Sequence, residues 1–90
     1  MKTFLIAYNL VNISKTQIDS LTNKIRSLQY WAKPLAAVWL IKTQYSKEAI
    51  INFLKPELYA GDKIVVIEVT NDWISMNLDK EVVEWMKGGL

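Results

Sequence analysis

Apolar residues change their spacing along the chain, and this spacing divides the sequence into predicted strands and helices. Residues 3–8 and 64–69 are apolar at nearly every position, which is typical of strands covered on both faces. Residues 38–43 are rich in β-branched and aromatic side chains and predict a third strand. Residues 31–35 predict a short edge strand, because Pro34 has no N–H to donate to a second neighbour.

The first helix is predicted for residues 16–29, where apolar side chains recur at steps of three or four. Ser14 or Thr16 can cap its N-terminus. The apolar stripe is made of Ile18, Leu21, Ile25 and Leu28. This periodicity predicts one buried helix face against the sheet.

Two further helices are marked by their ends. Ser46 is a predicted N-cap for a helix that runs to about Leu54, where a proline two residues later prevents its continuation. Asp79 is a predicted N-cap for a last helix through Met86, which two glycines terminate. Between the second helix and the last strand, Gly61 and Asp62 are interpreted as turn residues with no further role.

The predicted order is strand, helix, strand, strand, helix, strand and C-terminal helix. Two right-handed crossovers of this kind make an α+β, ferredoxin-like βαββαβ sandwich with an additional C-terminal helix. We expect residues 1–70 to form this domain and residues 71–90 to form a docking or dimerisation segment of the same domain. Both crossover helices cover one face of such a sheet, so the other face needs a cover. The C-terminal helix, with Trp85 and Met86, or a second copy of the chain would supply it.

The amino-acid composition excludes several kinds of catalytic and metal-binding site. The chain has no cysteine and no histidine, which excludes disulfides, thiolate catalysis, zinc-finger sites and histidine acid–base catalysis. The first residues have no apolar run of signal-peptide length, and no segment reaches the apolar length that spans a bilayer. We therefore expect a soluble, cytoplasmic protein with no membrane partner.

Charge is divided unevenly between the two parts of the chain. Residues 1–56 contain eight Lys or Arg and two Asp or Glu, a net charge of +6, whereas residues 57–90 contain three and seven, a net charge of −4. Such a division can create a basic face for an anionic ligand, or it can let the basic half of one subunit attract the acidic half of another. The ordinary alternative is a solvated surface that binds no partner. Candidate phosphate contacts are Arg26, Lys33 and Lys42, and candidate stacking aromatics are Trp31, Trp39 and Tyr45.

Several short motifs resemble those of a known family. The opening "MKTFLIAYNL", the helical stripe after it and "AVWLIKT" are similar to the CRISPR-associated Cas2 group. Val38–Thr43, Ile67–Val69 and a tail with Asn71-Asp72-Trp73 and Glu84-Trp85-Met86-Lys87 resemble still more closely the stand-alone Cas2-like proteins of the SinR family. The resemblance covers nearly the whole chain and implies a ferredoxin-like homodimer.

The resemblance also implies a site, which this chain departs from. Proteins of the Cas2 group are metal-dependent nucleases in some cases and non-catalytic, DNA-bridging scaffolds in others. Their first strand typically ends in Tyr-Asp, and that aspartate is the proposed magnesium ligand. Here the pair is Tyr8-Asn9, and Ala37 replaces a serine of the family pattern. An uncharged amide is a poor ligand for Mg²⁺, so no metal and no cofactor are expected. Tyr8 and Asn9 stay candidates for binding a phosphate or a base, beside the simpler interpretation as a strand end.

Three functions remain open from the sequence. The first is a non-catalytic, homodimeric Cas2-like module that binds nucleic acid or a protein partner, with Trp73, Trp85 and Met86 at the dimer interface. The second is a weak, toxin-like nuclease dependent on Mg²⁺, for which Glu68 and Asp72 are candidate catalytic residues. The more ordinary role of Glu68 is to pair with Lys42 or Thr43 across the sheet or the dimer. The third is a protein that senses or sequesters a small nucleotide.

Overall fold

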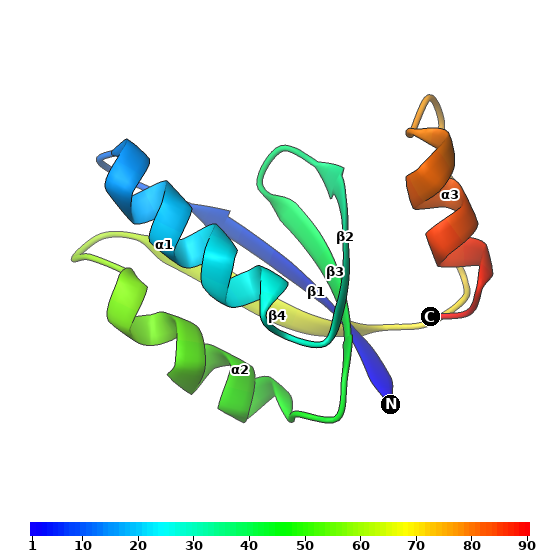
Figure 1. The fold of residues 1–90 in the computed structure, drawn as a ribbon, viewed down its shortest axis with the longest axis horizontal. Coiled ribbons are helices and arrows are strands. Elements are labelled where there is room, and N and C mark those ends of the chain that lie inside the picture. Colours follow the sequence, from blue (N-terminus) through cyan, green and yellow to red (C-terminus); the bar gives the residue numbers. More distant parts are fainter.

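The computed structural model describes all residues from 1 to 90 and shows an α+β fold with one four-stranded antiparallel sheet (Figure 1). The sheet order is β2-β3-β1-β4. The order of strands and helices predicted from the sequence is confirmed. The elements are β1 (Lys2–Asn9), α1 (Lys15–Arg26), β2 (Tyr30–Leu35), β3 (Val38–Thr43), α2 (Lys47–Leu54), the 3₁₀ turn η1 (Lys55–Glu57), β4 (Lys63–Val69) and α3 (Lys80–Lys87).

Side chains cap the first two helices as their sequences predict. The hydroxyl of Ser14 accepts a hydrogen bond from the N–H of Gln17 at 3.1 Å, so Ser14 caps α1, and the hydroxyl of Ser46 caps α2 in the same way. The predicted end of α1 at Gln29 is wrong, since the helix stops at Arg26. Gln29 has a φ of 35°, a left-handed conformation that turns the chain into β2 and cannot continue a helix.

The core lies between the sheet and the two helices α1 and α2, which cover the same face (Figure 1). We call this the helix face of the sheet. Side chains alternate along each strand, so Phe4, Ile6 and Tyr8 of β1 point to this face. The main cluster of buried residues consists of Phe4, Ile6, Leu10, Leu21, Ile25, Leu28, Trp39, Ile41, Ile50 and Leu54.

The three α-helices have 12 residues or fewer, and none of them has the length and apolar character of a membrane-spanning helix.

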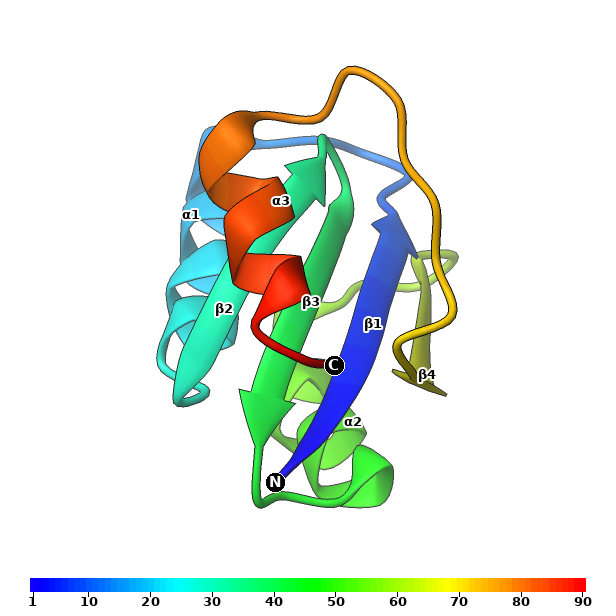
Figure 2. The same ribbon diagram turned by 90° about the vertical axis from the view of Figure 1, so that its right-hand side faces the viewer.

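The helix α3 lies on the opposite face, which we call the open face, and Figure 2 shows it crossing β2 and β3. Met86 is 8% exposed and Leu40, beneath it on β3, is also buried. The half of the open face formed by β1 and β4 has no helix over it (Figure 2). Val65 and Ile67 of β4 are exposed there. The C-terminal helix therefore covers only part of the face for which the sequence predicted a cover.

Pro34 lies in the edge strand β2, as predicted, and it lies at an irregularity. Ala32 pairs with Leu40 and Leu35 pairs with Val38, so the register shifts between these two pairs. Lys33 and Pro34 together therefore face one residue of β3, Trp39. An extra residue on one strand is a β-bulge, which bends the strand and redirects its side chains. Here the bulge brings Lys33 to the ring of Trp39, the central residue of the candidate site.

Candidate nucleic-acid interface

Trp39 is the centre of a cluster of basic and aromatic side chains on the helix face. Its ring is fully buried, and its indole Nε1 lies 3.5 Å from the hydroxyl of Tyr8, a long hydrogen bond. The guanidinium carbon of Arg26 lies 5.5 Å from the centre of the ring, and Nζ of Lys33 lies 5.1 Å from it. Both distances are within the range of a cation–π interaction. Three of the five binding residues predicted from the sequence thus meet at one side chain.

Trp31 completes this arrangement at its exposed side. Its ring packs edge-to-face against Trp39, with centres 5.4 Å apart and planes inclined at 61°. Arg26 also lies over Trp31, at 5.4 Å. Trp31 is 40% exposed, so part of this ring is open to solvent. We call the whole group the Trp39 cluster, and its members are Tyr8, Arg26, Trp31, Lys33 and Trp39.

The two cations of the Trp39 cluster have no anionic partner. Asp19, two turns before Arg26 on the same face of α1, is held by Lys15 at 2.8 Å. A guanidinium has five N–H donors, and those of Arg26 make no hydrogen bond within the protein. They are free for an anion or for water. The four ion pairs of the chain are Lys2–Glu68, Lys15–Asp19, Lys24–Glu57 and Lys47–Glu48.

Lys42 and Asn9 lie outside this cluster. Lys42 belongs to the open face, and its Nζ lies 4.5 Å from the centre of the Trp85 ring on α3. It therefore holds the C-terminal helix and is separated from Arg26 by the sheet. Asn9 is exposed at the end of β1 and lines a hollow of about 240 Å³ with Tyr8 and Ile13. Tyr8 thus contacts both the hollow and the Trp39 cluster.

The candidate catalytic carboxylates, Glu68 and Asp72, belong to no group of three acidic side chains. Glu68 pairs across the sheet with Phe4 and so points to the helix face, where Lys2 reaches it at 3.9 Å. The predicted pairing with Lys42 across the sheet is wrong, because Lys42 points to the other face. A pairing of Glu68 across a dimer stays a prediction. Asp72 is exposed beyond the end of β4. Nowhere in the chain do three acidic side chains come together in a group that could hold a metal ion.

A groove of about 510 Å³ runs along the open face between the sheet and the C-terminal segment. Its walls are mostly apolar and include Leu5 and Leu40 from the sheet and Trp73 and Ile74 from the segment after β4. Ile74 is 96% exposed. Of the predicted interface residues, Trp73 and Trp85 keep some exposed surface, whereas Met86 is buried within its own chain. Their assignment to a dimer interface stays a prediction.

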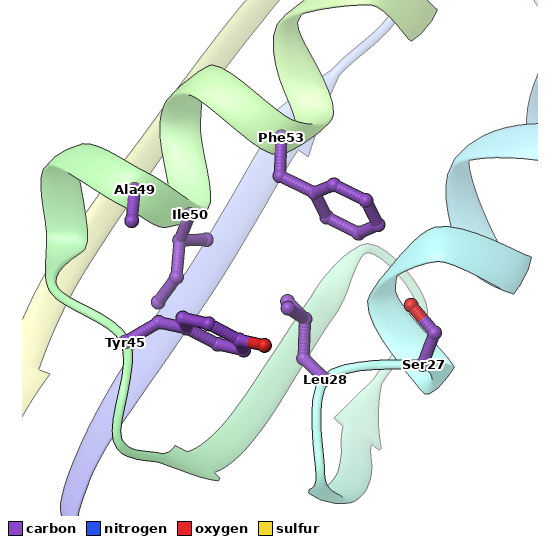
Figure 3. A pocket seen from close by; sticks show the side chains of 6 residues that line it. All are labelled: Ser27, Leu28, Tyr45, Ala49, Ile50 and Phe53. Atoms are coloured by element: carbon purple, nitrogen blue, oxygen red, sulfur yellow. The ribbon is translucent and has the colours of Figure 1, made fainter.

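A second apolar hollow, of about 250 Å³, lies between the end of α1 and the start of α2 (Figure 3). Tyr45, a predicted stacking residue, lines it and points toward Leu28, so it is not part of the Trp39 cluster. The hydroxyl of Ser27 donates to the carbonyl of Lys24 at 2.6 Å. The hollow contains no carboxylate and no amine, and its polar side-chain groups are the hydroxyls of Ser27 and Tyr45.

The interpretation of Asp62 as a turn residue with no further role is wrong, because its carboxylate also binds residues outside the turn. One carboxylate oxygen accepts from the N–H of Val11 at 2.8 Å, and the other accepts from the N–H of Tyr59 at 2.8 Å and from the amide of Gln17 at 2.7 Å. These hydrogen bonds, that of Val11 foremost, lower the pKa of Asp62. An Asp after a turn glycine is a local signal for the Tyr59 contact, but no local signal points to Val11, 51 residues away.

Comparison of the chain with family models, with curated proteins and with solved structures finds no match. The resemblance of its short motifs to the Cas2 group therefore stays a prediction. The geometry of the Trp39 cluster and of the open face is the basis for a function.

Proposed function

We propose that the protein is a Cas2-like homodimer with a ferredoxin-like fold that binds nucleic acid and has no catalytic activity. The observation that carries this proposal is the convergence of Arg26 and Lys33, neither of them in an ion pair, on Trp39 beside the half-exposed ring of Trp31. Cations without an anionic partner are available to phosphates, and an exposed aromatic ring is available to a base.

The ferredoxin-like assignment is supported by the order β2-β3-β1-β4 and by the two helices on one face. The absence of catalysis is supported by Asn9, an amide where the resemblance implies a carboxylate. Glu68 also lies far from it. Phe4, the partner of Glu68 in the sheet, is five residues before Asn9, about 17 Å along an extended strand. The two positions cannot share a cation within one chain.

The homodimer is supported by the uncovered half of the open face. Val65 and Ile67 on β4 are exposed. In the segment after β4, the exposed Ile74 lines the groove of the open face, and Met76, two residues later, is also exposed. Apolar side chains gathered on one face mark an interaction surface more often than a solvated one. In a two-fold symmetric dimer the same patch of each subunit lies at the interface. Each copy of the chain would therefore cover the exposed half of the open face of the other.

The test is a binding measurement across a range of salt concentrations. Fluorescence anisotropy with labelled RNA and DNA oligonucleotides would compare the wild type with Arg26→Ala and Lys33→Ala. The matched control is Lys55→Ala, which removes one exposed charge from η1, far from β2. We expect each cluster variant to weaken binding and to reduce the slope of log K against log salt by about 0.7 to 0.9. Equal losses in all three variants, or no binding by the wild type, would contradict the proposal.

A further inference from the structure

The Trp39 cluster has the features of a site for an unpaired base with its phosphate. Trp31 offers an exposed ring, and Trp39 holds that ring from its buried side in an edge-to-face contact. Arg26 reaches both rings, and Lys33 reaches Trp39. We infer that the nucleic acid bound here is single-stranded, with one base stacked on Trp31 and an adjacent phosphate held by Arg26 and Lys33. This inference rests on the proposed function.

Stacking is the first reason for a single strand. In a duplex both faces of each base are covered by its neighbours, so Trp31 would find no free base face. An aromatic ring at a sheet edge can instead receive a base from an unpaired strand, whatever the sequence of that strand. Trp31 lies on β2, which is an edge strand of the sheet. No neighbouring strand obstructs the approach from that side.

The distribution of charge is the second reason. Binding a duplex through its phosphates requires several cations spread along a surface. The helix α1 carries three cations, Lys15, Lys24 and Arg26, but Lys15 is held by Asp19 and Lys24 by Glu57 at 3.1 Å. Only Arg26 of the three is left without an ion pair. Arg26 and Lys33, two cations without ion pairs beside one pair of aromatic rings, can hold one or two phosphates of a flexible strand. They are too few to match the regular rows of phosphates along a duplex.

The open form of the site favours a strand over a single nucleotide. Small ligands bind in concave sites that bury most of their surface. Of the Trp39 cluster only Tyr8 lines one of the three hollows described above, and none of them includes Trp31, Arg26 or Lys33. One stacked base and one phosphate on an open surface give little affinity by themselves. A strand that reaches the clusters of both subunits of the proposed homodimer would gain affinity from the second contact.

The experiment compares two neighbouring aromatic residues of β2. Trp31→Leu removes the proposed stacking ring, and Tyr30→Leu is the matched control, because Tyr30 is 58% exposed but points to the open face. The probes are oligo-uridine RNA and oligo-thymidine DNA of about 16 nucleotides, the corresponding duplex DNA, and uridine monophosphate as competitor. We expect Trp31→Leu to weaken single-strand binding by roughly 5- to 100-fold. Tyr30→Leu should change it less than twofold, and the duplex should bind more weakly than either single strand.

Each other outcome has a defined meaning. If the duplex binds at least as tightly as the single strands and Trp31→Leu has no effect, the inference fails and the proposed function stands. If no polynucleotide binds, the proposed function fails as well. If uridine monophosphate displaces the oligonucleotides at a concentration equal to theirs, the site takes a nucleotide and the inference is wrong. If Trp31→Leu does not fold, Trp31→Phe replaces it, and the expected result is a smaller loss that still exceeds that of Tyr30→Leu.

Discussion

The carboxylate of Asp62 accepts a hydrogen bond from the backbone N–H of Val11 at 2.8 Å, which ties the turn before β4 to the loop after β1. The same carboxylate reaches Gln17 at the start of α1. Gly61, in the left-handed conformation at φ 88°, lets the chain turn there. One side chain thus connects the turn with two other parts of the fold.

Asp62→Ala should lower the melting temperature by several degrees at about pH 7, because three donors lose a charged acceptor. Folding lowers the pKa of Asp62, so its contribution is complete above the ordinary value of 3.8 and is lost as the pH falls through the lowered pKa. The wild type and the variant should therefore converge in strong acid. Thermal unfolding of both proteins at about pH 7 and in strong acid measures the difference.

The control for this prediction is Asp19→Ala. Asp19 is also acidic, but it makes an exposed i,i+4 ion pair with Lys15. Such a pair contributes little to stability. If Asp19→Ala destabilises the protein as much as Asp62→Ala does, the carboxylate of Asp62 has no special role in joining the loops.

The contact between Lys42 and Trp85 gives a second prediction. Met86 is buried against the open face, and Lys42 covers the adjacent Trp85 ring at 4.5 Å. Met86→Ala should release α3 from the sheet at a cost of about 2 kcal/mol or more, whereas Lys42→Met should cost about 0.5–1 kcal/mol. Hydrogen exchange should show faster exchange for the amides of α3, with those of β1 unchanged. Equal acceleration in β1 would mean that α3 is an integral part of the core.

The order of strands and helices along the chain and the edge position of β2 could be predicted from the sequence, because they depend on apolar periodicity and on one proline. The contacts of the candidate site could not. The meeting of Lys33 with Trp39 depends on a shift of register at Pro34, which no spacing reveals. The pairing of Glu68 with Lys2, in place of Lys42, depends on which face each residue points to. Side-chain direction in a sheet follows from register, and register is a property of two strands together.

The proposed dimer gives a third prediction. Ile67 is 51% exposed on the open face of β4, so Ile67→Lys should place a charge in the interface and produce monomers. Sedimentation velocity over a range of concentrations measures the change in mass. Ile13→Lys is the matched control, since Ile13 is an exposed isoleucine in the loop after β1. A wild type that stays monomeric at all concentrations, or an Ile67→Lys variant that stays dimeric, would remove this face as the interface.

Asn9→Asp tests whether a metal site has been lost or was never complete in this chain. We expect no cleavage of single-stranded RNA or duplex DNA by the wild type or the variant, with Mg²⁺ or with Mn²⁺. The residue paired with Asn9 across the sheet is Lys63, so the new carboxylate would lie beside a cation and not beside a second acid. Mg²⁺ is held through carboxylates and water, and cleavage of a phosphodiester needs it beside the phosphate.

A labelled-substrate assay with chelator and with a Glu68→Ala variant distinguishes the outcomes. If Asn9→Asp cuts and the wild type does not, the frame of a nuclease site survives and only its ligand was missing, with the remaining ligands supplied from the second subunit. If the wild type cuts, chelator stops it and Glu68→Ala is inactive, the proposal of a non-catalytic module is wrong. In that case Glu68 would have to leave Lys2 to reach the metal, so Lys2→Ala should raise the rate.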